Sequence, residues 1–331
     1  MKALLCKQFG APETLVLQEV EPAVLNDREV RVAIHAAGLN FADILMTAGQ
    51  YQVKPPLPFS PGMEMAGVVT EVGPGVTRVR KGDRVMSTCI HGGFAEERCI
   101  SEDMVFPLPD EISFVTAAAF PITYGTVFHA LTDRAALKSG EWLLVHAASS
   151  GVGLNAVELG KMMGAKVIAC SSTDEKLQII KGYGADELVN YTHESIRERV
   201  LAITDGRGAD VIFDPVGGDV FDESLRCIAW EGRLLVVGFA AGRIQQIPAN
   251  RVLLKECQIV GVNTSQFIKH KLEEYRDRFA MMLRWTAEGK LRPLISATYP
   301  LDQVARAMAT VKARSATGKI VITTRSQGAE Q

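Results

Sequence analysis

A glycine-rich turn between an apolar run and a helical run constrains the fold of this chain more than any other feature. The apolar run is Trp142–Val145, the turn reads ASSGVG over 148–153, and the helical run extends over 154–163. A strand, a tight turn and a helix N-terminus in this order hold the phosphates of a dinucleotide in a Rossmann unit. The turn therefore supplies five candidate cofactor-binding residues, which are Ser149, Ser150, Gly151, Val152 and Gly153.

The turn departs from the G-x-G-x-x-G pattern at two positions. Ala148 and Ser150 replace the first two glycines, while Gly153 keeps the third. Small side chains still let the backbone approach a pyrophosphate, and the N–H groups and dipole of the helix N-terminus favour its negative charge. A glycine-rich turn without a ligand is the structural alternative. The strand before the turn and the helix after it favour the dinucleotide site.

Strand-like and helical runs alternate from about residue 122 to 263, which predicts a doubly wound parallel sheet of six strands. The expected strands are Trp142–His146, Lys166–Cys170, Glu187–Asn190, Asp210–Phe213, Leu234–Gly238 and Gln258–Val262. The intervening helices are expected to start near Gly153, Thr173, Glu194, Gly218 and Pro248.

The two ends of the chain have a different character. Residues 1–121 consist mainly of short strands with frequent turns, which is typical of a small β-rich, barrel-like module. Near the C-terminus we expect a long helix over 266–288, a shorter helix over 301–314 and a closing strand over 319–323. These pieces do not continue the alternating rhythm of the middle part. They are therefore expected to return to the first module.

Composition and charge limit the class of protein. A chain of 331 residues that is 47% hydrophobic and 22% charged is typical of a soluble protein with two domains. The net charge of −2 is not that of a nucleic-acid-binding protein, and no apolar run reaches the roughly 18 residues of a membrane span. Six scattered cysteines without a CxxC pair, and an N-terminus without a signal-peptide pattern, predict a cytoplasmic protein with reduced thiols.

The end of the second expected strand distinguishes the two nicotinamide dinucleotides. NAD enzymes usually carry an acidic residue there that binds both ribose hydroxyls. Here the position is Ser171, and Ser171, Ser172 and Lys176 can donate hydrogen bonds to the 2′-phosphate of NADPH, which a carboxylate would repel. Asp174 and Glu175 are expected in the first turn of the next helix, where they favour its dipole. A solvated helix residue is the alternative for Lys176. The pattern favours NADPH.

Short motifs of one superfamily occur along most of the chain. They are AGLNFAD at 37–43, PGMEMAG at 61–67, GDRV at 82–85, the segment 147–153, GAD at 184–186 and DPVGG at 214–218. Together they resemble the zinc-free medium-chain dehydrogenases/reductases of the NADPH:quinone oxidoreductase (zeta-crystallin-like) family. The resemblance implies a GroES-like catalytic domain over 1–121 and 264–331, a Rossmann NADPH-binding domain over 122–263, and a homodimer.

The resemblance also implies roles for particular residues. Lys176 and Tyr191 match contacts to the 2′-phosphate, and Asn40 matches an asparagine beside the nicotinamide. Tyr51 matches an aromatic residue at the substrate cleft, and Thr123 lies where the family packs the nicotinamide ring. Asn40, Tyr51 and Thr123 are therefore the expected catalytic residues. The further cofactor contacts implied are Gly217, Gly238, Phe239, Val262, Asn263 and Thr264.

The resemblance extends to what is missing. Zinc alcohol dehydrogenases of the same superfamily bind their catalytic zinc through cysteine, histidine and a second cysteine. The corresponding positions here are Asn40, Met63 and the segment 120–122, so no metal is expected. Cys89 and His91 at CxH spacing are expected to be ordinary loop residues.

The expected activity follows from the absence of a metal. Without zinc no Lewis acid polarises a carbonyl, so the acceptor must already be electron-poor. The leading hypothesis is hydride transfer from NADPH to a small-molecule quinone. One alternative is reduction of the C=C bond of an enone, acrylate or enoyl thioester, and another is a non-enzymatic NADPH-binding structural or RNA-binding protein. Some family members have a tyrosine where this chain reads Ile44-Leu45-Met46, so a match of substrate to those members is not implied.

Overall fold

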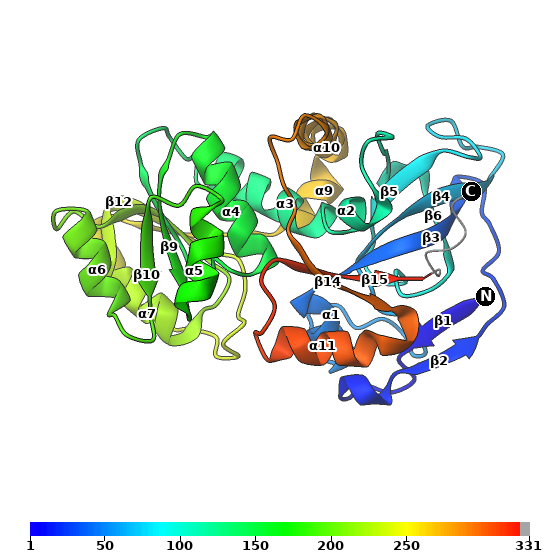
Figure 1. Ribbon diagram of the computed structural model, residues 1–331, viewed down its shortest axis with the longest axis horizontal. Coiled ribbons are helices and arrows are strands. Elements are labelled where there is room, and N and C mark those ends of the chain that lie inside the picture. Colours follow the sequence, from blue (N-terminus) through cyan, green and yellow to red (C-terminus); the bar gives the residue numbers. More distant parts are fainter. Residues whose placement is uncertain (325–331) are drawn as a thin grey trace. The chain divides into compact units, whose positions relative to one another are not determined.

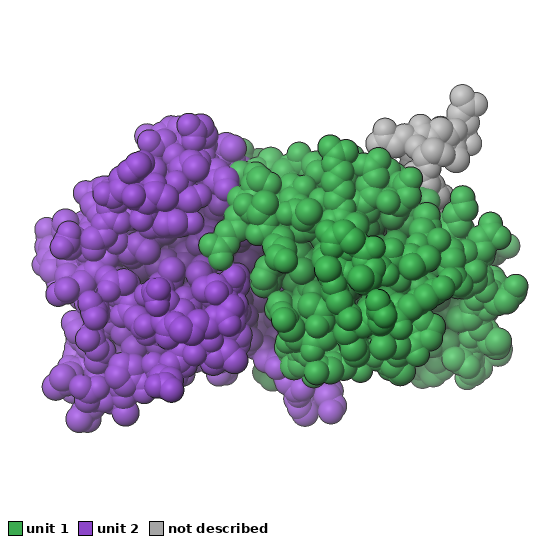
Figure 2. Space-filling view, turned by 90° about the horizontal axis from the view of Figure 1, so that it is seen from below, with its two compact units in different colours: residues 1–122, 271–331 green, residues 123–270 purple. Residues whose placement is uncertain are grey.

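The structure is a computed structural model of the chain, and it describes residues 1–324. The chain divides into two compact units (Figure 2). One contains Met1–Ile122 together with the chain from Lys271 onward, and the other is Thr123–His270. The catalytic and cofactor-binding domain ranges expected from the sequence stay a prediction. The last part of the expected range 264–331, residues 325–331, lies outside the described residues.

The unit Thr123–His270 is built on a six-stranded parallel sheet (Figure 1). Its strands are β8 (Trp142–Val145), β9 (Lys166–Ser171), β10 (Glu187–Asn190), β11 (Ala209–Asp214), β12 (Ile228–Val236) and β13 (Gln258–Gly261). They lie in the order β10-β9-β8-β11-β12-β13. The chain order reverses between β8 and β11, which is the place where doubly wound sheets bind ligands. The six-stranded parallel sheet predicted from the sequence is confirmed.

The helices of this unit include three that begin at a side-chain cap. They are α3 (Pro121–His129, which spans the boundary), the π-helix η3 (Ala130–Arg134), α4 (Gly151–Met162), α5 (Asp174–Lys181), α6 (Ile196–Ile203), α7 (Gly218–Cys227), α8 (Ala249–Lys255) and α9 (Thr264–His270). The hydroxyl oxygens of Ser150, Thr173 and Ser195 accept hydrogen bonds from backbone N–H groups in the first turns of α4, α5 and α6. Each hydroxyl satisfies a donor that the helix leaves unpaired.

Helices pack on the central strands of this sheet. Helices α4 and α5 contact β9, and α7 contacts β11 and β12. Residues on β8, β9 and β11 are fully buried, among them Leu144, Ile168 and Ile212. Their near-continuous apolar sequences reflect burial on both faces, which is typical of parallel sheets. The strand ends that carry the predicted cofactor residues therefore rest on a well-packed core.

The other unit is centred on a larger mixed sheet (Figure 1). Its path is β14 (Ile295–Pro300), β15 (Lys319–Thr323), β3 (Glu29–Leu39), β4 (Glu64–Val72), β5 (Arg84–Thr88) and β7 (Val105–Pro107), and β6 (Glu97–Ser101) pairs with β3. Strands β1 (Lys2–Leu5) and β2 (Val16–Glu19) form a separate pair. Strand β15 is antiparallel to β3. The expected return of the C-terminal segment to the first module is thus confirmed.

The helices of this unit are short except for one. They are η1 (Pro12–Thr14), α1 (Phe41–Thr47), η2 (Glu102–Met104), α2 (Phe114–Ala118), α10 (Leu272–Ala287), η4 (Leu301–Gln303) and α11 (Val304–Lys312). Helix α11 places Val304, Ala307 and Met308 in the same hydrophobic core as Val32 and Ile34 of β3. The C-terminal segment therefore contributes to the core of the unit as well as to its sheet.

The sequence-based expectation for the C-terminal part is wrong at two places. The single helix expected over 266–288 is interrupted, because Lys271 has φ −142° and ψ 49° and so leaves the helical region between α9 and α10. Strand β14 was not predicted. Its sequence, ISATYP, has only a half-buried face and ends on a proline, so it lacks the apolar run that marks the other strands.

Candidate active site

A buried ion pair lies at the centre of the polar cluster in the unit that contains both chain ends. Lys319 Nζ is 2.6 Å from Glu64 Oε1, and the two side chains are 7% and 0% exposed. Lys319 begins β15 and Glu64 begins β4, and both strands pair with the end of β3, at Leu39 and Gly38. The sheet register therefore brings together two charges that are far apart in the sequence.

The ion pair fixes the side chain of Asn40, which follows β3. Lys319 Nζ donates to Asn40 Oδ1 at 2.8 Å, and Asn40 Nδ2 donates to Glu64 Oε1 at 2.8 Å. Lys319 Nζ also donates to the carbonyl of Leu39, and Glu64 Oε2 accepts from the N–H of Ile122. An ammonium on one side and a carboxylate on the other permit one orientation of the Asn40 carboxamide. One of its two N–H donors is used by Glu64.

Asp43 fixes the backbone of the same segment. Its carboxylate accepts from the N–H of Asn40 at 2.9 Å and from the N–H of Gly62 at 3.1 Å, so it closes the capping box of α1. The side chain is fully buried. Burial raises the pKa of Asp43 from 3.8 to about 7, and the hydrogen bond from Asn40 and the charge of Lys319 oppose that rise.

Tyr51 lies in the same unit but outside this hydrogen-bonded cluster. It is half-buried and packs against a small core of Cys6, Met46, Phe59 and Met63. Burial raises the pKa of its phenol, and the charge of Asp43 adds to the rise. Among the described residues no hydrogen bond joins Tyr51 to Asn40. The structure therefore places these two predicted catalytic residues in one unit, with no hydrogen bond between them among the described residues.

The glycine-rich turn has the geometry of a phosphate-binding turn. Ser150 is the N-cap of α4, and its Oγ accepts from the N–H of Gly153 at 3.1 Å. A Cβ at Gly153 would lie 2.1 Å from the carbonyl oxygen of Ala147, so only glycine fits where helix and strand approach. Ala147 has a φ of +48° at the start of the turn. The turn leads from β8 into the N-terminus of α4, as the sequence predicted.

Thr123, the third predicted catalytic residue, is packed against α4. Its Oγ1 accepts from Asn155 Nδ2 at 2.9 Å, and both side chains are buried. Next to it, the hydroxyl of Tyr124 donates to Glu158 at 2.6 Å. Helix α4 therefore holds α3 through two polar contacts, and it also forms the helix N-terminus of the phosphate turn.

The residues predicted to bind the 2′-phosphate follow β9 and β10. Ser171 and Asn190 are paired at the ends of these strands, and Tyr191, 41% exposed, follows directly. The hydroxyl of Ser171 is buried and has no hydrogen-bond partner in the part of the chain that the structure describes. An unpaired buried hydroxyl is costly, and a phosphate or ribose oxygen is the kind of acceptor that would satisfy it. Lys176 lies in the first turn of α5.

The acidic residues near this end have structural roles. Asp174 and Glu175 lie in the first turn of α5, as expected from the sequence. Asp174 Oδ1 accepts from Asn190 Nδ2 at 2.7 Å, which joins α5 to the end of β10. The ends of β9 and β10 are therefore braced without a carboxylate at the Ser171 position.

The other predicted cofactor residues follow β11, β12 and β13. At the end of β11, Asp214 Oδ1 accepts from the N–H groups of Val216 and Gly217, and Gly217 has a φ of +70°. Gly238 and Phe239 follow β12, and the N–H of Val262 after β13 donates to Val236. Two further contacts lie in the α9 segment, where Asn263 Oδ1 accepts from Gln266 N–H and Thr264 Oγ1 donates to Thr126 Oγ1.

The parallel sheet brings these residues to one edge. Ser149–Gly153, Ser171, Ser172, Tyr191, Gly217, Gly238, Phe239 and 262–264 all follow the carboxyl ends of its strands, which is the binding edge of such sheets. The glycine-rich turn, the unpaired hydroxyl of Ser171 and the N-terminus of α4 would fit a dinucleotide at this edge. Asn40 and Tyr51 belong to the other unit.

Two residues of the site were not singled out from the sequence. Glu64 and Lys319 each stand at the start of an apolar strand, in MEMAG and GKIVI. A charge in such a run is the signal that would have marked them, because a buried charge requires a partner. Their pairing depends on the register of strands at opposite ends of the chain, which the sequence pattern does not reveal.

The thiols and histidines of residues 1–324 do not assemble a metal site, because no group of three or more potential ligands comes together there. Cys89 Sγ lies 3.4 Å from the carbonyl of Gly62, and burial raises the pKa of this thiol to about 12. The thiol is thus protonated near neutral pH. Over the same described residues, no helix has both the length and the apolar character that crossing a bilayer requires.

Family comparisons agree with this architecture. Residues 26–110 match the alcohol dehydrogenase GroES-like domain family, and residues 151–285 match the zinc-binding dehydrogenase family. The chain is 43% identical to the quinone oxidoreductase-like protein 2 homolog of Nematostella vectensis, over 98% of this chain and 89% of the relative. It is 33% identical to quinone oxidoreductase of Homo sapiens, over 97% of both chains.

Solved structures give the same result. The quinone oxidoreductase of Pseudomonas syringae superposes with a TM-score of 0.93 at 32% identity, covering 98% of this chain and 99% of that one. The quinone oxidoreductase of Escherichia coli, solved in complex with NADPH, has a TM-score of 0.92 at 30% identity, with coverage of 98% and 100%.

Proposed function

Because this chain belongs to the quinone oxidoreductase family of the medium-chain dehydrogenases/reductases, and is an NAD(P)-dependent oxidoreductase, we propose that it reduces quinones with NADPH and without zinc. The observation that carries the zinc-free part is the Asn40 cluster. Asn40 stands where zinc-dependent members have a metal-binding cysteine, and the Lys319 ammonium lies 2.8 Å from its oxygen. A cation placed beside this ammonium would be repelled.

The choice of NADPH is supported by the ends of β9 and β10. Ser171 holds the position at which NAD enzymes present a carboxylate. Its hydroxyl is buried and has no hydrogen-bond partner among the described residues. Tyr191 follows the neighbouring strand, and Lys176 lies in the first turn of α5. A hydroxyl, a phenol and an ammonium suit a dianionic phosphate better than they suit two ribose hydroxyls. The NADPH complex of the Escherichia coli relative supports the same choice.

The proposed reaction converts NADPH, a proton and a quinone into NADP⁺ and a hydroquinone. The cofactor supplies a hydride, and a proton from solvent completes the reduction. A quinone needs no Lewis acid, because it is already electron-poor, so positioning provides much of the rate. We assign this positioning to Asn40, Tyr51 and Thr123. Asn40 retains an N–H donor that Glu64 does not use, and its orientation is fixed before any ligand arrives.

A proposed homodimer is supported by the exposed edge of the six-stranded sheet. Strand β13 is its last strand, and Ile244 and Leu253 in the segments before it are 71% and 76% exposed. Large exposed apolar side chains favour burial against a second copy. Light scattering should give twice the 35.9 kDa of the chain, and Leu253→Lys should lower that mass. A monomer in the unmodified protein contradicts this part of the proposal.

The proposed location is the cytoplasm. The proposed reaction requires no partner other than NADPH and a small-molecule acceptor. The six cysteines are free thiols, which fits a reducing compartment. In this scheme the unit with both chain ends is the GroES-like catalytic domain, and the unit Thr123–His270 binds NADPH.

Steady-state kinetics with two coenzymes and two acceptor classes test the proposal. We expect NADPH to be oxidised by 1,4-benzoquinone or a naphthoquinone, NADH to be used much less well, and EDTA to have no effect. Preferred turnover of enones, acrylates or enoyl thioesters would identify a C=C reductase instead. NADPH binding without turnover of any acceptor would point to a structural or RNA-binding protein. Stoichiometric zinc in the active protein would contradict the metal-free mechanism.

A further inference from the structure

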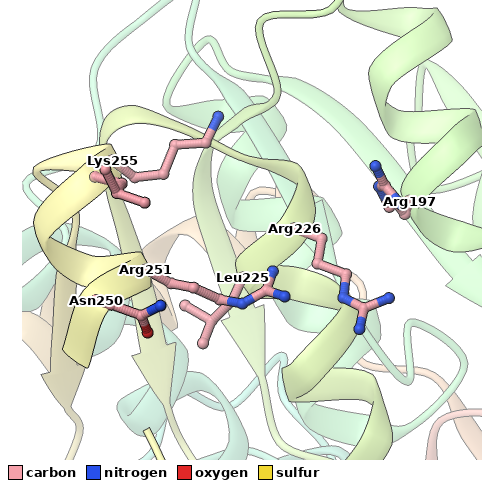
Figure 3. A pocket seen from close by; sticks show the side chains of 7 residues that line it. Arg197, Leu225, Arg226, Asn250, Arg251 and Lys255 are labelled. Atoms are coloured by element: carbon pink, nitrogen blue, oxygen red, sulfur yellow. The ribbon is translucent and has the colours of Figure 1, made fainter. Parts of the chain in front are cut away.

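A basic pocket opens on the helices of the unit Thr123–His270. It has a volume of about 530 Å³ and is lined by side chains from α6, α7 and α8 (Figure 3). Arg197 belongs to α6, Arg226 to α7, and Arg251 and Lys255 to α8. Figure 3 shows Arg251 and Arg226 extending from different helices into this space. Four cationic side chains from three helices therefore line one cavity.

Most of these charges have no counter-ion within residues 1–324. Arg226 forms an exposed ion pair with Glu223 of its own helix, at 3.2 Å. Among the described residues, no ion pair or side-chain hydrogen bond involves Arg197, Arg251 or Lys255. Arg251 and Lys255 are half-buried, so solvent screens them less than fully exposed charges. Like charges held together in this way repel each other, and an anion between them would offset that repulsion.

The pocket is separate from the dinucleotide edge of the sheet. Leu225 and Arg226 are near the end of α7, whereas the predicted cofactor residue Gly217 precedes its first residue, Gly218. At a rise of 1.5 Å per residue, about 12 Å of helix lies between Gly218 and Arg226. None of the pocket residues follows a strand of the sheet directly. A ligand in the pocket would thus not occupy the cofactor turn.

We propose that this pocket binds a small oligoanion that carries two or more adjacent phosphate groups. Guanidinium groups bind phosphate oxygens in pairs, and three of the four cations here are arginines. The volume suits a small molecule, and Leu225 and Leu254 provide apolar contacts for an organic part such as a nucleoside. The four cations line one cavity, whereas nucleic acids and membranes require an extended basic surface.

Calorimetric titration of the full chain tests this site. The protein is first saturated with NADP⁺ so that the cofactor site is filled, and inorganic tripolyphosphate or ATP without Mg²⁺ is then added. We expect one site per chain whose affinity falls as salt rises. The double variant Arg226→Gln/Arg251→Gln should weaken binding by at least about tenfold. Tighter binding of ATP would identify a nucleotide ligand, and equal or tighter binding of tripolyphosphate would identify the phosphate chain itself.

A matched variant distinguishes binding in the pocket from a general effect of the positive charge of the protein. Lys181→Gln/Lys269→Gln also removes two positive charges from this unit, but away from the pocket, and its affinity should stay within about twofold of the unmodified protein. NADPH oxidation by a quinone should be unchanged in the pocket variant. The inference is overturned if NADP⁺ prevents oligophosphate binding, if both double variants lose affinity equally, or if only an oligonucleotide or anionic vesicles bind at the arginines.

Discussion

Lys319 and Glu64 form a buried ion pair of 2.6 Å between the first residues of two strands, one from each end of the chain. Their shared partner, Asn40, is the residue to which the proposed function assigns orientation of the reactants. The pair thus connects the stability of the sheet with the geometry of the site. The contribution of the ion pair to the free energy of unfolding can be measured separately from the contributions of the two individual side chains.

Replacing Lys319 alone should be more harmful than replacing both charges. Lys319→Met leaves Glu64 buried without a counter-charge and should lower the free energy of unfolding by about 3–5 kcal/mol. The double variant Lys319→Met/Glu64→Gln removes both charges and should recover part of this loss. Urea unfolding of the four proteins of the cycle measures the coupling. If the loss of unfolding free energy in the double variant equals the sum of the losses in Lys319→Met and Glu64→Gln, the pair does not act as a unit.

Asp43 should make stability depend on pH in an unusual direction. Its pKa is about 7 in the folded protein and 3.8 ordinarily, so the folded state binds the proton more tightly. The stabilisation is complete below pH 3.8 and is lost as pH rises through 7, in total on the order of 4 kcal/mol. Lys319 and Glu64, the charges that face Asp43, act in opposite directions on this pKa.

The variant Asp43→Asn isolates this effect. Asparagine cannot titrate, so the difference in unfolding free energy between the two proteins should change from about pH 4 to pH 7, in the direction that the unmodified protein loses stability, and should level off above about pH 7. Denaturant unfolding at several pH values measures the difference, and titrations common to both proteins cancel. A constant difference across this range would show that Asp43 does not titrate there.

Gly153 should not tolerate even one methyl group. An alanine Cβ would lie 2.1 Å from the carbonyl oxygen of Ala147, so Gly153→Ala must displace either α4 or the turn. We expect a loss of stability of about 1–3 kcal/mol and weaker NADPH binding. Gly261→Ala is the matched control, because no atom lies within 4 Å of its Cβ position. Fluorescence titration with NADPH and thermal unfolding distinguish the two variants.

Lys176 should discriminate between coenzymes. Lys176→Gln removes the charge proposed to face the 2′-phosphate and should raise KM for NADPH by about tenfold while leaving KM for NADH unchanged. Lys181→Gln removes a charge from the last turn of the same helix and should change neither constant. Equal effects on both coenzymes would place Lys176 outside the phosphate site.

The sequence predicts the middle of the chain far better than its ends. All six strands of the parallel sheet and the start of α4 follow from local apolar runs and caps, which need no knowledge of distant residues. The interruption at Lys271 and the half-polar strand β14 depend on tertiary packing, which overrides local pattern. For the same reason Asn40 could be proposed as a site residue from its motif, whereas its partners Glu64 and Lys319 could not.

The position of β15 in the larger sheet has a consequence for biosynthesis. The ammonium that orients Asn40 belongs to Lys319, which lies 279 residues further along the chain. Strand β15 is therefore made long after β3, and after the whole unit Thr123–His270 has been translated. Nascent chains stalled before β15 would carry the whole unit Thr123–His270 but an Asn40 side chain that lacks its ammonium partner.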